Sequence, residues 1–135
     1  MEEALVAKLL DTTALTALVG ERIYWLDRPQ GTAVLPQIVL QDWSADHQIT
    51  MEGPNPLRET LVQIDCWGAS QAESLMVGRE LIAALEGARF TQDSIDFPGI
   101  FFVTRRRTIE PGGTQSASRY YRTSIDFRIW HSELA

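Results

Sequence analysis

The 135 residues carry 18 acidic and 12 basic side chains, a net charge of −6, and 44% are hydrophobic. This composition supports one folded core, and the acidic excess argues against a protein that neutralises nucleic-acid phosphates. The single cysteine, Cys66, excludes an internal disulfide and a multi-cysteine zinc site, and no apolar run approaches the roughly 20 residues that span a bilayer. We expect one domain over residues 1–135, kept in the cytoplasm of the producing cell because Met1-Glu2-Glu3 lacks the basic start of a signal peptide.

The N-terminal third predicts two helices and two strands. Residues 2–10 place leucines on one helical face, and a second short helix ends before Gly20. Residues 22–25 and 36–43 have the composition of strands. Residues 44–56 are polar and rich in turn-forming residues, so we expect a long loop there.

The centre of the chain gives the clearest pattern. Residues 57–67 alternate, with Ile64 and Cys66 on one face, as a half-buried strand does. Ser70 and Glu73 have capping-box spacing and begin a helix that runs to Glu86. Gly78 in mid-helix costs stability, which indicates a close approach to the sheet.

The C-terminal half predicts further strands. Residues 95–97 and 100–109 read as strand segments that Pro98-Gly99 separates, and residues 119–130 read as a long final strand. Strands joined by hairpin-like loops predict an α+β fold. We expect a mostly antiparallel sheet of about four to five strands with the helices packed on one face.

The search for chemistry finds no active site. His47 and His131 have no second metal ligand at a suitable spacing, and Cys66 lies on the apolar face of its strand. Asp65 and Asp126 share a sheet face if their strands are neighbours. Such a pair can be acid–base machinery, but ion pairs with Arg122 or Arg128 are the better interpretation. We expect no enzyme, no cofactor and no metal.

Two features suggest contact surfaces. Arg105, Arg106 and Arg107 form the one local basic cluster, with Arg106 pointing opposite to its neighbours. It is a solvated strand end, an inter-subunit ion-pair site or a polyanion patch. Trp67 and Trp130 lie among charged side chains on the polar face of the sheet. That pattern suits a partner surface, or aromatic rings covered by loops of the same chain.

Four stretches of the sequence are informative together. They are residues 15–24 (LTALVGERIY), 35–40 (LPQIVL), 62–67 (VQIDCW, followed by the helix with Ala72-Glu73) and 121–131 (YRTSIDFRIWH). Each is weak alone, but their order and spacing cover almost the whole chain. Together they resemble a family of small tail-completion, or tail terminator, proteins of long-tailed phages and gene transfer agents.

The resemblance implies a structural protein without catalytic residues. Its copies would form a ring, commonly six-fold, that caps the head-proximal end of the tail tube, ends tail growth and joins the tail to the head connector. The implied partners are further copies, tail tube protein and a head-completion protein, with no membrane and with DNA at most passing through. The candidate interface residues are Asp65, Trp67, Arg105, Arg106, Arg107, Asp126, Arg128 and Trp130. A small-molecule or peptide-binding α+β module remains the alternative.

Overall fold

A computed structural model describes residues 1–25, 35–50, 53–111 and 119–133. Three helices and six strands follow in the order ααβββαβββ. The helices are α1 (Glu2–Leu10), α2 (Thr13–Val19) and α3 (Gln71–Leu85). The strands are β1 (Ile23–Trp25), β2 (Gln37–Thr50), β3 (Gly53–Gly68), β4 (Phe90–Gln92), β5 (Ile95–Pro111) and β6 (Arg119–Glu133).

All six strands form one sheet in the order β1-β2-β3-β6-β5-β4. The expected α+β class is confirmed, whereas the expected four to five antiparallel strands are wrong. The sheet is mixed because β1 pairs parallel to β2, and every other pairing is antiparallel. The sequence missed β4 because three residues are too short to show alternation.

The loop expected at residues 44–56 is also wrong. Its described residues continue the ladder between β2 and β3, from the Ser44–Leu61 pair to the Thr50–Gly53 pair, with a register shift between His47 and Ile49. Likewise, β5 runs through Pro98-Gly99 as one strand, with a register shift between Asp96 and Gly99. A backbone ladder continues wherever a partner strand lies alongside, so turn-forming residues can be absorbed as bulges.

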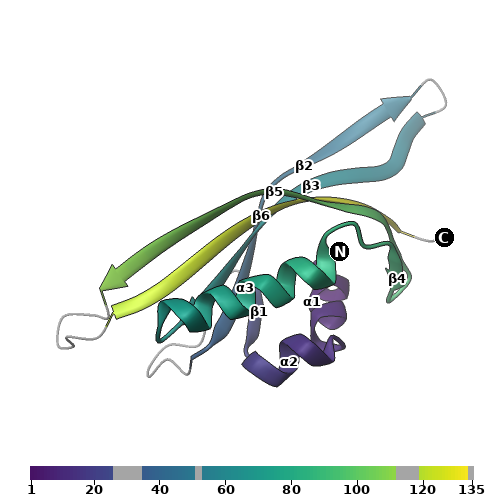
Figure 1. Ribbon diagram of the computed structural model, residues 1–135. Helices are drawn as coiled ribbons and strands as arrows, with labels where there is room; N and C mark the ends of the chain where they lie inside the picture. The colour runs from purple at the N-terminus through teal and green to yellow at the C-terminus, as the bar shows by residue number, and fades with distance from the viewer. Residues whose placement is uncertain (26–34, 51–52, 112–118, 134–135) are drawn as a thin grey trace.

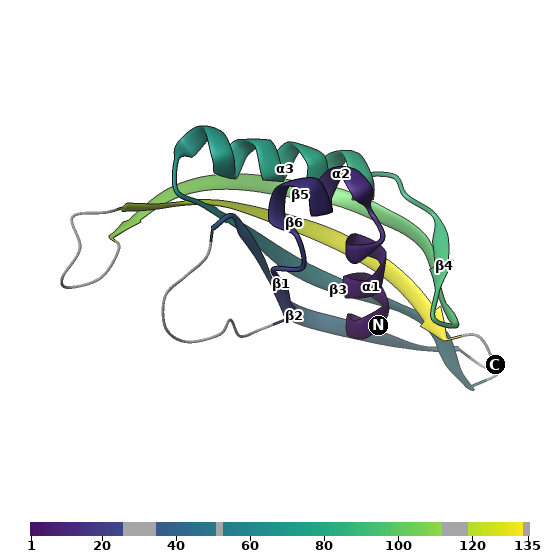
Figure 2. The same cartoon turned by 90° about the horizontal axis from the view of Figure 1, so that it is seen from below.

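The three helices lie on one face of a curved sheet, as Figures 1 and 2 show. We call this the helix-covered face and the opposite one the open face. Beyond the helices, the β2–β3 and β5–β6 hairpins project in opposite directions (Figure 1). No helix among the described residues is long and apolar enough to cross a membrane.

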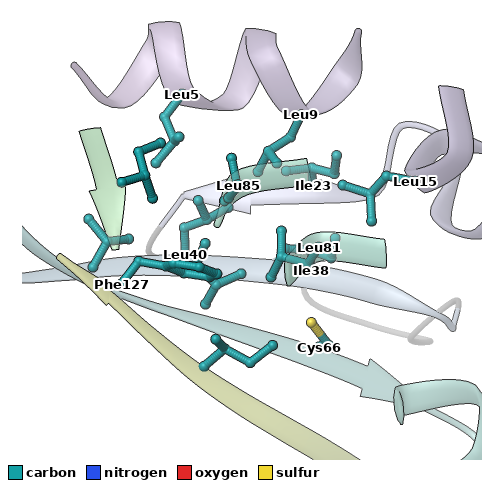
Figure 3. Close-up of a cluster of buried hydrophobic side chains, with 14 of the residues drawn as sticks. Leu5, Leu9, Leu15, Ile23, Ile38, Leu40, Cys66, Leu81, Leu85 and Phe127 are labelled. Carbon is teal, nitrogen blue, oxygen red and sulfur yellow. The ribbon is translucent and has the colours of Figure 1, made fainter. Parts of the chain in front are cut away.

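The core lies between the helices and the helix-covered face (Figure 3). Leu5 and Leu9 of α1 and Leu81 and Leu85 of α3 pack with apolar residues of β2, β3 and β6. The prediction for Cys66 is confirmed, since it is fully buried there.

The two features predicted for α3 are confirmed. Ser70 Oγ accepts a hydrogen bond from the Glu73 backbone N–H at 3.2 Å, which caps the helix. A Cβ atom added to Gly78 would lie 3.3 Å from Thr123 Cγ2, which is tighter than most real contacts, and 3.4 Å from Ile125 Cδ1, which is close to an ordinary van der Waals contact. Glycine therefore lets α3 approach β6 closely.

Candidate functional site

The open face gathers the polar residues of β3 and β6 because both strands alternate in the same register. Gln63 lies opposite Asp126, and Asp65 lies opposite Ser124. The expectation that Asp65 and Asp126 share a face is therefore confirmed. All four residues are less than a tenth exposed.

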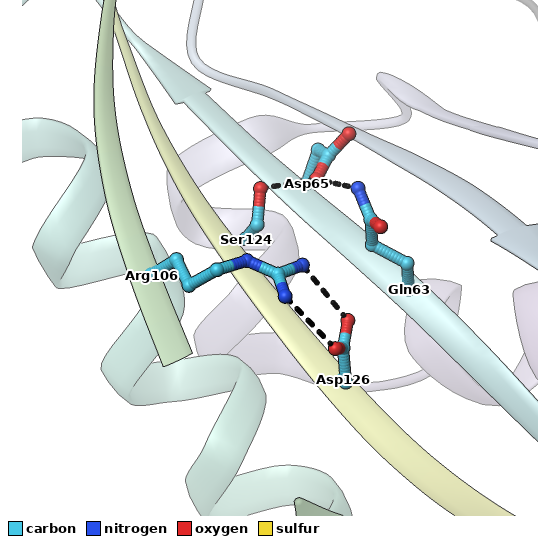
Figure 4. A network of polar contacts seen from close by, with 5 residues as sticks. All are labelled: Gln63, Asp65, Arg106, Ser124 and Asp126. Carbon is cyan, nitrogen blue, oxygen red and sulfur yellow. Dashed lines mark hydrogen bonds and ion pairs between the residues drawn. The ribbon is translucent and has the colours of Figure 1, made fainter. Parts of the chain in front are cut away.

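A hydrogen-bonded network holds these side chains (Figure 4). Asp65 Oδ1 accepts hydrogen bonds from Ser124 Oγ at 2.7 Å and from Gln63 Nε2 at 2.9 Å. Asp126 forms an ion pair with Arg106, with Nη1 3.4 Å from Oδ2. Buried polar groups need such partners, so the network stabilises this part of the sheet within one chain.

The expected ion pairs are correct in kind but only partly in partner. Arg122 Nη1 lies 4.0 Å from Asp65 Oδ2, which is the predicted pair. Asp126 pairs instead with Arg106 of β5. Arg128 pairs with Glu59, with Nε 2.7 Å from Oε1. Burial raises the pKa of Asp126, the Asp65 carboxylate raises it further, and Arg106 opposes both effects.

The two tryptophans lie on the open face, as predicted. The Arg122 guanidinium carbon lies 5.2 Å from the centre of the Trp67 ring. The Trp67 and Tyr120 rings meet edge to face, with their centres 6.5 Å apart. Trp130 lies opposite Glu59 in the sheet. The partners of Asp65 lie in the same chain.

The arginine cluster divides between the two faces, as its spacing predicts. Arg106 lies opposite Ser124, on the open face, while Arg105 and Arg107 lie opposite Ile125 and Thr123 of the helix-covered face. All three are exposed. Arg106 therefore belongs to the same face as Asp65 and Trp67, whereas Arg105 and Arg107 belong to the other face.

Sequence reasoning missed an exposed apolar run on β5. Phe101 is 53% exposed, Phe102 38%, Val103 45% and Ile109 55%. A register shift falls between Phe102 and Thr104. The signal was present, because three consecutive large apolar residues in a strand cannot all face one core.

Two residues that could take part in chemistry, His131 and Cys66, are buried. His131 is buried and bonded to Thr60 Oγ1 at 2.7 Å, and burial raises the pKa of the Cys66 thiol, which keeps it protonated. The side chain of His47 lies outside the described residues. In the described ranges, His, Cys, Asp and Glu form no group of three that could hold a metal ion.

Comparisons with known proteins point in one direction. A family model described as "Tail completion protein gp17" matches residues 3–132. No curated protein matches in sequence. A chain of the solved structure "Virion of native gene transfer agent (GTA) particle" matches with a TM-score of 0.73 at 18% identity, covering 98% of this chain and 94% of that chain. At that identity the likeness concerns the fold.

Proposed function

Because the chain belongs to the tail completion protein gp17 family, we propose that it forms a ring that caps the head-proximal end of a phage-type tail tube. The match over residues 3–132 carries this proposal, since it spans nearly all of the helices and the sheet. The family consists of structural virion tail proteins, which are generally not enzymes. The protein therefore has a structural role in a phage-type tail.

The ring ends tail growth and joins the tail to the head connector. Its partners are further copies of the chain, with six as the proposed number, tail tube protein and a head-completion protein. DNA passes through the ring without sequence-specific binding. The chain assembles in the cytoplasm of the producing cell and then remains in the particle. The shape supports a ring, because a cyclic assembly needs two different patches on each subunit and the two projecting hairpins provide distinct flanks.

The open face around Trp67, Arg128 and Trp130 is the proposed contact surface for a neighbouring subunit or another partner. Arg128 is half exposed and its pair with Glu59 is accessible, so it can contact a partner without unfolding the sheet. Asp65 and Asp126 are buried on the same face, and their contacts within the chain hold the surrounding side chains in place. A contact of this kind should bury on the order of 1,000 Å² or more.

Particle assembly without the protein tests the function. Deleting its gene should yield tails that fail to join heads, and adding the purified chain should restore joining, as counted in electron micrographs. Arg128→Glu should fail to restore it while still folding and melting cooperatively. Arg79→Glu, on the exposed side of α3, is the matched control and should restore it.

Normal particles without the protein would refute the proposal. In that case the binding-module alternative moves ahead. It predicts a chain that stays monomeric at high concentration and whose melting temperature rises with a ligand.

A further inference from the structure

The two projecting hairpins carry opposite charge. Residues 105–111 and 119–125, which form the ladder from the Arg105–Ile125 pair to the Pro111–Arg119 pair, contain five arginines and one glutamate, which gives 5 − 1 = +4. Residues 42–50 and 53–62, which form the ladder from the Asp42–Val62 pair to the Thr50–Gly53 pair, contain three acids and one arginine, which gives 1 − 3 = −2. We call them the basic hairpin and the acidic hairpin. The basic hairpin stands out on a chain whose net charge is −6.

Each hairpin also has a sheet edge that no described strand covers. On the outer side of β5, β4 pairs only with Ile95–Phe97. On the outer side of β2, β1 pairs only with Ile38–Leu40. In the order β1-β2-β3-β6-β5-β4, these two edges lie on opposite flanks of the sheet. An uncovered edge is a template for pairing with another strand.

One hydrogen bond shows which backbone groups of β5 face away from β6. The Gly87 N–H donates to the Ile100 carbonyl at 2.8 Å, so the backbone groups of Ile100 point away from β6. Because backbone groups alternate along a strand, those of Phe102 point outward too, where no described strand lies beside them. The exposed run of Phe101, Phe102 and Val103 flanks this edge. Apolar side chains along an open edge favour a strand partner over solvent.

We propose that the outer edge of β5 pairs with the outer edge of β2 in a second copy, so that the basic hairpin of one subunit lies along the acidic hairpin of the next. This inference rests on the proposed ring and specifies its subunit contact. The occupant is another copy because the chain itself carries the complementary charge on its opposite flank. Residues 41–50 of β2, the ten that lie beyond the pairing with β1, would span about 33 Å at ~3.3 Å per residue. Head-to-tail repetition of this contact closes a ring.

Paired charge reversals test the contact between hairpins. Arg105→Glu/Arg107→Glu/Arg119→Glu changes the basic hairpin from +4 to 4 − 6 = −2. Asp42→Arg/Asp46→Arg changes the acidic hairpin from −2 to −2 + 4 = +2. Each variant alone then has hairpins of like sign and should remain at the 15.2 kDa monomer mass. An equal mixture restores attraction at every contact. It should assemble to the wild-type mass, with both chains present equally, as measured by light scattering and mass spectrometry.

The backbone pairing has its own test. Phe102→Pro and Phe102→Ala both remove the phenyl side chain, but only proline also removes the backbone N–H that points outward from the sheet edge. Both variants should melt cooperatively as monomers, and the proline variant should assemble at least ten-fold more weakly than the alanine variant. Equal assembly of the two would overturn strand pairing at this edge.

The outcomes separate the two proposals. If the free wild-type chain does not assemble, the same samples are added to purified tail tubes and imaged. If either charge-reversed variant alone forms rings as well as the wild-type chain does, the contact between hairpins is overturned and the proposed ring stands. A wild-type chain that forms no ring either free or on tubes would overturn the proposed function itself.

Discussion

Removing the Asp65 carboxylate should destabilise the isolated subunit, because its partners lie within the same chain. In Asp65→Ala, Ser124 Oγ and Gln63 Nε2 lose the acceptor that now lies 2.7 and 2.9 Å away. Both donor residues are at least nine-tenths buried, so water replaces the carboxylate poorly. Hydrogen bonds to a charged group contribute about 1.5–3 kcal/mol each. The free energy of unfolding should therefore fall by about 3 kcal/mol.

A double-mutant cycle with Ser124→Ala separates this bond from the rest of the network. Ser124→Ala alone should cost about 1.5 kcal/mol, and the coupling between the two sites should be about 1–2 kcal/mol in urea unfolding. The control is Glu59→Ala, which removes an ion pair to the half-exposed Arg128 and should cost less than about 1 kcal/mol. An Asp65→Ala protein as stable as wild type, or a coupling near zero, would refute the reasoning. Asp65 would then be free to act at an interface.

Three further measurements test the core, the helix cap and the pH response. Leu81→Ala should lower the free energy of unfolding by about 2–5 kcal/mol because Leu81 is fully buried. The control Met76→Ala, on the exposed side of the same helix, should change it by under about 0.5 kcal/mol. Equal effects would contradict the packing of α3. Ser70→Ala should cost about 1 kcal/mol in thermal unfolding, and no loss would mean that the hydroxyl does not cap α3. Burial raises the pKa of Asp126, so the folded chain holds that proton more tightly than the unfolded chain, and stability should fall as pH rises through the raised pKa. Asp126→Asn should remove this fall, and an unchanged pH profile would exclude Asp126 as its cause.

The sequence alone determined the elements whose pattern is local. Alternation in residues 57–67 and 119–130 identified two long strands and assigned Cys66 to the core. Capping chemistry at Ser70 located the start of α3. Gly78, which is unfavourable in the middle of a helix, indicated the close contact of α3 with the sheet. Such signals depend on neighbours a few residues away, so a single chain displays them. The resemblance to tail-completion proteins likewise combined local stretches and is confirmed by the family match.

Tertiary structure decided which distant segments meet. The pairing of Asp126 with Arg106 depends on β5 lying beside β6, which the spacing of either strand alone does not reveal. The parallel direction of β1 and the extension of β2 to Thr50 depend in the same way on a partner strand. Which edges remain open is a property of the whole strand order. The charge of each hairpin can be counted in the sequence, but only the fold places the two on opposite flanks, because long-range pairing sets the strand order.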